Sequence, residues 1–593
     1  MTSPLFTTRP ELAGTFGAVA STHWLASAAG MAILEQGGNA FDAAVAAALV
    51  LQVAEPHLNG PGGDVPILLY NAAEERVRVL CGQGPAPAGA TIAHYRGEGL
   101  DLIPGTGLLA TVIPGAFDAW MTMLRDFGTL GLEDIFARAL GYADQGVPLV
   151  PGISDTIASV RDLFSSEWTT SAAVFLPGGE VPAPGTVFAN KALAATWRRI
   201  LDEAKGPSGR EAQIDKARES WSQGFVAEAI DRFCRDNEVL DASGARHRGV
   251  LSGTDMAGWE AGYEDPLSYD YCGHTVFKSG PWAQAPVFLQ QLALLKGFDV
   301  AAMDPTGPDF VHTVVECAKL AFSDREAWYG DPAFVDVPLG DLLSDAYNDE
   351  RRALVTGAAS LDLRPGSPGG RAPRLPDLAR GPSAADAGVG DPTTASPGGV
   401  RGDTCHLDVV DRWGNMVSAT PSGGWLQSSP VVPELGFSLN TRAQMFWLEE
   451  GLPSSLEPGK RPRTTLTPTL VFRGGSPYVA MGTPGGDQQD QWQVTCLLHH
   501  IDHGMNLQEM IDTPSFHSGH CPSSFFPRAA QPGHLVVESR FGADTVAELE
   551  RRGHGVETGP AWSEGRMSAV SRDKGLVRAA ANPRGMQGYA VCR

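Results

Sequence analysis

The sequence predicts an α+β protein in which helices are layered on sheets that both halves of the chain contribute to. Helical patterns dominate the residues before position 363, and short apolar runs typical of strands dominate those after position 403. Between them, residues 363–402 are so rich in proline, glycine and alanine that we expect a solvated loop without regular structure. A helix-rich and a strand-rich portion of one globular chain bury their apolar faces best by packing on each other.

Composition supports a globular protein and excludes some classes of partner. The chain has 593 residues, of which 43% are hydrophobic and 19% charged, so it can bury a large core. Its formal charge of −23 opposes phosphate backbones and anionic lipids, so we expect neither a nucleic-acid nor a membrane partner.

Cysteine usage and hydropathy point to the cytoplasm. The eight cysteines are scattered without a C-x-x-C pair, which is typical of reduced core residues. No apolar run approaches the roughly 18–20 residues that span a bilayer. The first residues show no basic segment followed by an apolar one, so we expect no export signal.

The first portion is predicted to be mainly helical. Residues 24–36 form one amphipathic pattern, and a second, alanine-rich helix begins after Asn39 as its N-cap. The glycine turn NGPGGD at 59–64 leads into an apolar strand at 65–70. Further helices are expected at 115–147, 190–236, 285–298 and 309–330, with a strand at 274–280.

The last portion is predicted to consist mainly of strands. They are expected at 405–411, 415–420, 469–473, 478–482, 534–538 and 568–573. One clear helix is expected among them, at 490–504.

Thr404 stands at the boundary between the loop and the first of these strands. A threonine hydroxyl is a weak nucleophile, but the α-amine of a chain-terminal threonine can act as its base. Self-cleavage before Thr404 would create such a terminus, and an exposed tether would allow it. The alternative is that Thr404 only begins a strand.

The motifs across the chain decide between these interpretations. From Ala18 to Arg593 the sequence resembles the gamma-glutamyltranspeptidase family of N-terminal-nucleophile hydrolases. The matching stretches are GMAILEQGGNAFDAAVAAALVLQVAEPH, NGPGGD, IPGAFDAW, AFSDREAWYGDPAF, TCHLDVVDRWGNMVSAT, KRPRTTLTPTLV and GTPGGD. The resemblance implies a four-layer αββα sandwich formed from both halves of a self-cleaved precursor. It divides the chain into a large-subunit portion (1–362), a processing linker (363–403) and a small-subunit portion (404–593), which stay together as a heterodimer.

The resemblance also assigns the reaction machinery. Thr404 would attack the Asp403 carbonyl, and water would hydrolyse the resulting ester, so that the freed α-amine serves as the base of the same hydroxyl. His406 and Asp411 match the rest of this strand motif. Ser422 stands where the family has a second hydroxyl contacting the nucleophile, although it could be a plain turn serine. Gly485 and Gly486 match the pair whose amides form the oxyanion hole, although TPGG could equally be an ordinary turn.

The contacts that hold glutamate in the family are changed here. Gln83 stands where an arginine binds the α-carboxylate, and Thr464 and Thr465 replace two serines. Losing that arginine removes a bidentate, charge-assisted contact.

The ammonium contacts are changed as well. Gly424, Arg442 and Met445 replace the asparagine, glutamine and aspartate that hold the amino group. A cation at position 442 disfavours an ammonium and favours an acidic or oxo group, unless Arg442 is a surface or ion-paired residue.

These residues predict an amidohydrolase or acyltransferase that acts on a small acidic acyl substrate through an acyl-Thr404 intermediate, without a cofactor or metal. One alternative is a homologue that cleaves a carbon–carbon bond, removing an oxalyl-type group in alkylproline antibiotic biosynthesis. Another is a true glutathione hydrolase or transpeptidase. A non-catalytic binding protein and a zinc hydrolase are weaker alternatives. The zinc alternative would use the histidines of LLHHIDHG and FHSGH, but no H-E-x-x-H motif is present.

Overall fold

Two seven-stranded antiparallel sheets form the centre of the molecule. The computed structural model describes residues 6–377 and 404–593. In order across the first sheet lie β1 (Leu12–Gly14), β20 (Leu576–Ala581), β19 (Ser568–Asp573), β15 (Ser476–Gly482), β14 (Thr469–Arg473), β11 (His274–Lys278) and β10 (Leu267–Tyr271). The second sheet contains β21 (Tyr589–Cys592), β2 (Ala18–Ser21), β12 (Leu407–Val410), β13 (Met416–Ala419), β3 (Val65–Asn71), β4 (Arg76–Gly82) and β9 (Gly262–Glu264).

Both portions of the chain contribute strands to each sheet. In the second sheet β12 and β13, which follow Thr404, lie between β2 and β3 of the first portion. In the first sheet β11 of the first portion pairs with β14 of the last. A cut between the two portions would therefore leave their main-chain pairing in place.

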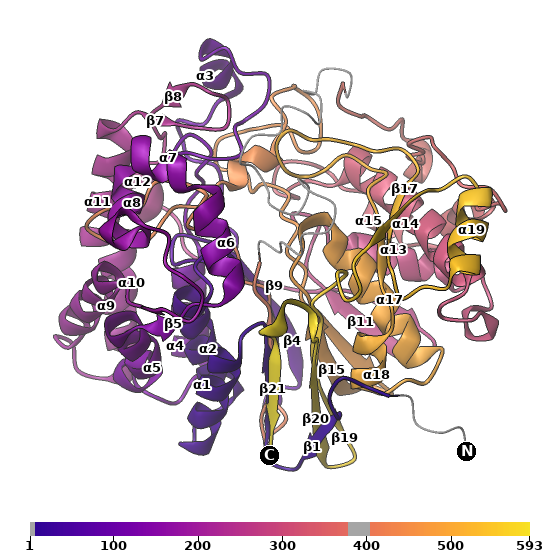
Figure 1. Ribbon diagram of the computed structural model, residues 1–593, viewed down its shortest axis with the longest axis horizontal. Coiled ribbons are helices and arrows are strands. Elements are labelled where there is room, and N and C mark those ends of the chain that lie inside the picture. Colours follow the sequence, from indigo (N-terminus) through magenta and orange to yellow (C-terminus); the bar gives the residue numbers. More distant parts are fainter. Residues whose placement is uncertain (1–5, 378–403) are drawn as a thin grey trace.

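Helices cover the outer face of each sheet (Figure 1). The second sheet is covered by α1 (Trp24–Glu35), α2 (Ala40–Ala54) and α4 (Ala116–Phe127). Further out, α5 (Leu132–Gln145), α9 (Lys191–Ala204), α10 (Arg210–Ser222) and α11 (Phe225–Asp236) pack on these helices and on one another. The first sheet is covered by α13 (Pro286–Leu295), α17 (Gln489–Ile501) and α18 (Leu507–Asp512). Further out, α14 (Pro308–Trp328) and α16 (Asp345–Arg352) pack on α13, and α19 (Ala543–Arg551) packs on α14.

Smaller elements complete the described chain. The short helices are α3 (Ile92–Gly97), α6 (Pro151–Ser159), α7 (Arg161–Ser166), α8 (Thr169–Phe175), α12 (Gly253–Ala257) and α15 (Leu339–Leu342). The minor sheets consist of β16 (Phe516–Ser518), β17 (His534–Glu538) and β18 (Gly555–Gly559), of β5 (Val147–Pro148) and β6 (Val187–Phe188), and of β7 (Val239–Leu240) and β8 (Arg246–His247).

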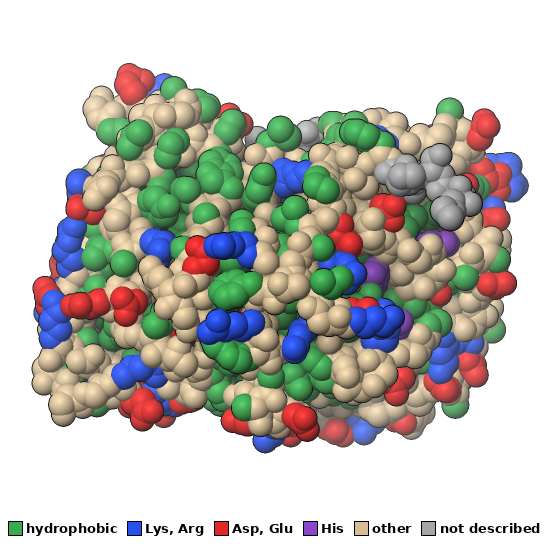
Figure 2. Space-filling view, turned by 90° about the horizontal axis from the view of Figure 1, so that it is seen from below, with side chains coloured by type: hydrophobic (Ala, Val, Ile, Leu, Met, Phe, Trp, Pro, Cys, Tyr) green, Lys and Arg blue, Asp and Glu red, His purple; other side chains and the backbone are tan. Residues whose placement is uncertain are grey.

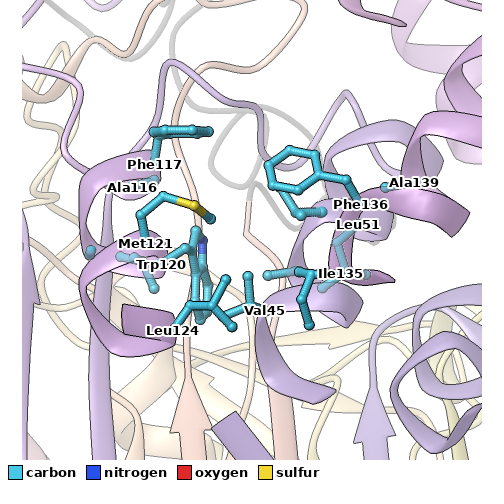
Figure 3. Packing of buried hydrophobic residues seen from close by; sticks show 14 of the residues in the cluster. Val45, Leu51, Ala116, Phe117, Trp120, Met121, Leu124, Ile135, Phe136 and Ala139 are labelled. Atoms are coloured by element: carbon cyan, nitrogen blue, oxygen red, sulfur yellow. The ribbon is translucent and has the colours of Figure 1, made fainter. Parts of the chain in front are cut away.

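The strands are apolar on both faces because both faces are covered. In β3, Ile67 and Leu69 belong to the cluster that faces the helices, whereas Leu68 and Tyr70 belong to the cluster between the sheets. Figure 3 shows the helical side, where Trp120 and Met121 of α4 pack near Val45 of α2. The predicted class of mixed helix and sheet is confirmed.

The helix α2 shows how local sequence determines an element. Asn39 accepts hydrogen bonds from the amides of Phe41 and Asp42 at 3.0 and 3.1 Å, and the Asp42 carboxylate accepts the Asn39 amide at 3.0 Å. This reciprocal capping box satisfies amides that the first helical turn leaves unpaired. The predicted N-cap is confirmed.

Two expectations about local structure were wrong. The last portion contains α18 and α19 as well as α17, because short helices pack against the minor sheet and the first sheet. Residues 363–377 are bound to α14 instead of being fully solvated: the Arg364 amide donates to Ser323 at 3.2 Å and the Gly366 amide to Asp324 at 2.6 Å. This segment also contains a 3-10 turn at Pro368–Gly370.

The surface carries charges of both signs. On the face shown in Figure 2, Lys and Arg side chains are interspersed with Asp and Glu and with hydrophobic side chains. Within residues 6–377 and 404–593, no helix combines the length and apolar character needed to cross a bilayer.

Candidate active site

Thr404 lies three residues before the first residue of β12 and faces Ser422. The two residues form an antiparallel β-bridge, both are 1% exposed, and their hydroxyl oxygens are 3.2 Å apart. The structure therefore brings together the two hydroxyls that the sequence placed in one site. Asp403, the predicted residue before the cut, lies outside the described residues, as does the rest of 378–402.

The side chains after Thr404 alternate between the two faces of the sheet, as the period of a strand requires. Cys405 belongs to the cluster on the helical side, where its thiol donates to Glu55 Oε2 at 3.0 Å. Burial, followed by the proximity of Glu55, raises the pKa of the Cys405 thiol well above its usual value. Cys405 is thus kept protonated and turned away from Thr404.

His406 points between the two sheets, on the same side as Thr404. Its Nδ1 lies 2.9 Å from Thr420 Oγ1 and its Nε2 lies 2.9 Å from Asp408 Oδ1. Asp408 also accepts hydrogen bonds from Ser418 at 2.8 Å and from Ser568 of the opposite sheet at 3.1 Å. These buried polar contacts fix the start of β12 relative to the other sheet.

Asp411 connects the turn after β12 to the N-terminus of α2. Its carboxylate accepts the Ala40 amide at the N-terminus of α2 at 2.9 Å and two amides of its own turn, from Trp413 and Asn415, at 2.9 and 3.0 Å. A carboxylate at a helix N-terminus is stabilised by the unpaired amides and by the helix dipole. Asp411 therefore ties the β12–β13 turn to α2.

The glycine pair follows β15, and the end of that strand lies against His406. A Cβ atom at Gly482 would come within 2.2 Å of His406 Cε1, so only glycine allows this approach. Gly485 has the left-handed φ of 114° and Gly486 one of 34°. Among the described residues, neither glycine amide donates a hydrogen bond, so both donors are left for another acceptor.

Buried polar groups hold the loop that carries the glycine pair. Gln284 Nε2 donates to the carbonyls of Gly486 and Asp487 at 3.5 and 3.4 Å. The Asp487 carboxylate is paired with Arg325. Burial alone would raise the pKa of Asp487, but the Arg325 guanidinium lowers it below its usual value, so the carboxylate stays charged.

Arg442 is a buried cation close to the hydroxyl pair, and its partner Asp64 forms an antiparallel β-bridge with Ser422. Arg442 begins the short helix η6 (Arg442–Met445), is 1% exposed, and its Nε donates to Asp64 Oδ1 at 2.8 Å. Its Cζ lies 5.4 Å from the centre of the Trp425 ring, and the Trp425 indole N–H donates to Ser422 Oγ at 3.3 Å. A single side chain, Trp425, thus connects Arg442 to the Thr404–Ser422 pair.

The two terminal nitrogens of Arg442 have no hydrogen-bond partner within the described part of the chain, although both are buried. A guanidinium carries five N–H donors in a planar fork that matches a carboxylate. Of the alternatives for this residue, a surface arginine is wrong and an ion-paired arginine is correct. The ion pair, however, uses Nε and leaves the fork for another anion.

The other substituted positions are also buried. Met445 packs with Trp425 and Phe525. Gly424 has a left-handed φ of 65°, and a Cβ atom there would lie 3.0 Å from the Gly62 carbonyl carbon, so an asparagine would be strained.

The predicted role of Gln83, Thr464 and Thr465 in substrate binding stays a prediction. Gln83 Nε2 donates to the Gly84 carbonyl at 3.0 Å, and Thr464 Oγ1 accepts the Leu466 amide at 3.4 Å. Gln83 Oε1 and Thr465 Oγ1 are buried without a hydrogen-bond partner in the described residues.

Three residues of the site were missed in the sequence. Asp64 was interpreted only as the end of a glycine turn, and neither Trp425 nor Phe525 was considered. Only its place as the last residue of the NGPGGD motif could have indicated Asp64, because its partner Arg442 is 378 residues away.

The histidines considered for zinc lie in separate contacts. His499 stacks on Phe310, His500 bonds to Tyr478 at 2.6 Å, and His520 Nδ1 accepts the Gly533 amide at 3.0 Å. No group of three or more potential ligands that could hold a metal occurs in residues 6–377 and 404–593.

The sheets are covered by helices, and the buried Thr404–Ser422 pair opens the last portion of the chain. Together with a glycine pair whose amides have no acceptor among the described residues, they define an enzyme of the N-terminal-nucleophile hydrolase or acyltransferase type. The profile of the gamma-glutamyltranspeptidase family matches residues 26–592, and the chain belongs to this family.

Similar proteins extend over nearly the whole chain. The glutathione hydrolase-like YwrD proenzyme of Bacillus subtilis (strain 168) is 31% identical over 587 residues, covering 98% of each chain. The oxamate amidohydrolase proenzyme of Klebsiella pneumoniae is 29% identical over 588 residues, covering 96% of this chain and 97% of its own. The solved structure of LmbA2991HD is 58% identical, with a TM-score of 0.94, and the match covers 99% of this chain and 100% of that one.

Proposed function

We propose that this protein is a self-processing N-terminal-threonine amidohydrolase or acyltransferase that acts on a small acidic acyl substrate. Two observations support the proposal together. The Thr404 and Ser422 hydroxyls lie 3.2 Å apart, and the Arg442 fork, buried and without a partner in the described residues, is joined to them through Trp425. Relatives across the whole chain are named proenzymes, which supports processing.

In the proposed processing step the Thr404 hydroxyl attacks the Asp403 carbonyl. The Asp403–Thr404 peptide bond breaks, the nitrogen takes up a proton and becomes the α-amine of Thr404, and the Asp403 acyl group is carried as an ester. Water then hydrolyses this ester. The products are a chain of residues 1–403 and a chain of residues 404–593, which remain a heterodimer because β12 and β13 pair with strands of the first chain.

In the proposed catalytic step the freed α-amine accepts the proton of the Thr404 hydroxyl as the oxygen attacks the substrate carbonyl. The amides of Gly485 and Gly486 stabilise the oxyanion, and the protonated leaving amine departs. Water, or an acceptor amine, then releases the acyl group from Thr404. The Ser422 hydroxyl orients the Thr404 hydroxyl, and the antiparallel β-bridge between the two residues keeps them side by side.

The acidic part of the substrate pairs with Arg442. Its two terminal guanidinium nitrogens, buried and without a partner in the described residues, match a carboxylate, and a bidentate charge-assisted pair of this kind is strong. Gln83, Thr464 and Thr465 supply further polar contacts. One relative is named an oxamate amidohydrolase, and oxamate carries a carboxylate next to its amide, which is the chemistry that Arg442 favours.

We further propose the family arrangement for the whole chain. The two sheets and their helices form a four-layer αββα sandwich, with residues 1–362 as the large-subunit portion, 363–403 as the processing linker and 404–593 as the small-subunit portion.

Processing is tested with Thr404→Ala and Thr404→Ser. Wild-type protein should separate on a denaturing gel into two chains, the smaller beginning Thr-Cys-His by Edman sequencing. Thr404→Ala should remain one full-length chain, and Thr404→Ser should be cleaved because it keeps a hydroxyl. An active wild-type preparation that stays a single chain would refute the proposal.

Substrate class is tested with matched anilides. Oxalyl, succinyl and glutaryl p-nitroanilides should be hydrolysed with a higher kcat/KM than gamma-glutamyl p-nitroanilide, because the last adds an ammonium near Arg442. The reverse order would favour a glutathione hydrolase. Release of a carbon acid instead of an amine from an oxalyl-type substrate, detected by mass spectrometry, would favour carbon–carbon cleavage.

A further inference from the structure

Residues 521–528 form a loop that brings Phe525 to the candidate active site. The loop lies between β16 and β17, far in sequence from the other site residues. Phe525 packs with Trp425 and Met445 in a separate buried cluster, in which the three side chains are 1%, 3% and 1% exposed. The fold, and not the strand motif, therefore places an aromatic side chain against Trp425.

The loop is attached at one end to the segment after the glycine pair. The Ser524 amide donates to Asp487 Oδ2 at 2.8 Å and the Ser524 hydroxyl to Asp487 Oδ1 at 2.6 Å. Asp487 is the residue directly after Gly486, and Arg325 holds its carboxylate. The residue before Phe525 is thus fixed to the candidate oxyanion loop.

The other end of the loop is attached to η6, which contains Arg442. The Phe526 amide donates to Gln444 Oε1 at 3.0 Å, and Arg528 Nη2 donates to the Gln444 carbonyl at 2.9 Å. Phe525 is consequently held between the loop that follows the glycine pair and the helix η6. In the proposed function a bound acyl group extends from the first of these segments to the second.

The cluster supplies the apolar part of the environment around Arg442. Trp425 has the Arg442 guanidinium 5.4 Å from its ring centre and donates its N–H to Ser422, so Phe525 and Met445 pack on the side chain that separates charge from nucleophile. None of the three cluster residues offers a carboxylate to an ammonium. A cationic fork bounded by apolar walls accepts a carboxylate joined to the reacting carbonyl by a hydrocarbon chain.

We propose that Phe525 is a specificity-determining residue that limits the length of the acidic acyl chain held between Thr404 and Arg442; this inference rests on the proposed function. With the carbonyl at Thr404 and the carboxylate at Arg442, added methylene groups must displace the cluster. A close-packed aromatic cluster resists such displacement, whereas a smaller side chain at position 525 leaves space for the longer chain.

The test measures binding of free dicarboxylates to the processed wild-type protein by isothermal titration calorimetry. The series is oxalate, succinate, glutarate and adipate, and the matching p-nitroanilides give turnover on the same chain lengths. The wild type should prefer the shorter acids. Phe525→Ala should raise the adipate-to-succinate affinity ratio at least about tenfold, the lower range for a methylene-sized change in an apolar pocket, while self-cleavage proceeds normally.

Two further variants keep the result interpretable. Phe526→Ala removes the neighbouring, half-buried ring of the same loop and should leave the length ranking unchanged. If circular dichroism shows that Phe525→Ala does not fold, Phe525→Leu is used instead. It enlarges the space at position 525 by less and should shift the length ranking in the same direction.

The outcomes separate the two proposals. If acids bind but neither Phe525 variant changes the length ranking, the assignment of Phe525 is wrong and the substrate class stands. If Phe526→Ala shifts the ranking equally, the assignment is also wrong. If no acid binds the wild-type protein, the acidic substrate class is wrong and the inference falls with it.

Discussion

Replacing Arg442 should reduce stability and substrate recognition through two separable contacts. Its Nε pairs with the buried Asp64 carboxylate at 2.8 Å, whereas Nη1 and Nη2 are without partners in the described residues. Removing one member of a buried pair leaves the other charge without its counter-ion, at a cost of about 3–5 kcal/mol. Removing a charge-assisted contact to substrate costs about 1.5–3 kcal/mol, which corresponds to a loss of about 10- to 150-fold in kcat/KM.

A set of variants separates these effects. Arg442→Met should lose both stability and activity, and Arg442→Met combined with Asp64→Asn should recover most of the stability because both charges are gone. The double variant should not recover activity on acidic acyl anilides. Arg442→Lys keeps the charge but loses the planar fork, so it should retain only part of the activity.

Stability is best measured in the Thr404→Ala background, where the protein should be a single chain and its urea midpoint should not depend on dissociation of two chains. Activity and self-cleavage are measured in the protein with Thr404 intact. Cleavage should proceed in the Arg442 variants because it attacks the chain's own carbonyl. Equal urea midpoints for the single and the double variant would refute the role of the Nε–Asp64 pair in stability. Full activity of the double variant would refute the role of Nη1 and Nη2 in substrate binding.

Three further predictions concern residues of the helices and strands that support the candidate active site. Asn39→Ala should destabilise the protein by about 1 kcal/mol, because α2 loses its capping box, and Asn39→Asp should restore most of it in urea unfolding; an unchanged midpoint would contradict the role of the cap. Gly482→Ala should cost about 1–3 kcal/mol, because its Cβ would press on the buried His406 ring, and a normal melting temperature with normal processing would show that the strand can yield. Lys278→Met should cost about 3–5 kcal/mol in urea unfolding, because it leaves the buried Asp490 carboxylate, 3.1 Å from Nζ, without its cation; adding Asp490→Asn should recover stability, and failure to do so would mean that packing dominates.

Much of the secondary structure was predictable because it depends on neighbouring residues. Asn39 and Asp42 cap α2 within one turn, and the apolar runs that form β3, β12 and β15 are interrupted by glycine-rich or polar turns. Residues 363–377 were misjudged for the opposite reason. Their composition favours a loop, but its Arg364 and Gly366 amides donate hydrogen bonds to Ser323 and Asp324 of α14 and so bind it to the core. No local sequence pattern indicates such distant partners.

The sequence alone identified the family, the nucleophile candidate Thr404 and the unusual charge at Arg442, since all three are motifs read at fixed spacing. It did not determine what surrounds them. The tertiary structure decides that Arg442 is buried, that it uses Nε for Asp64 and that its fork has no partner among the described residues, and it decides the contact of Phe525 with Trp425. The reason is physical: a hydrogen bond or a packing contact depends on distances of a few ångströms in space, and residues separated by 100 to 378 positions reach those distances only when both sheets have assembled.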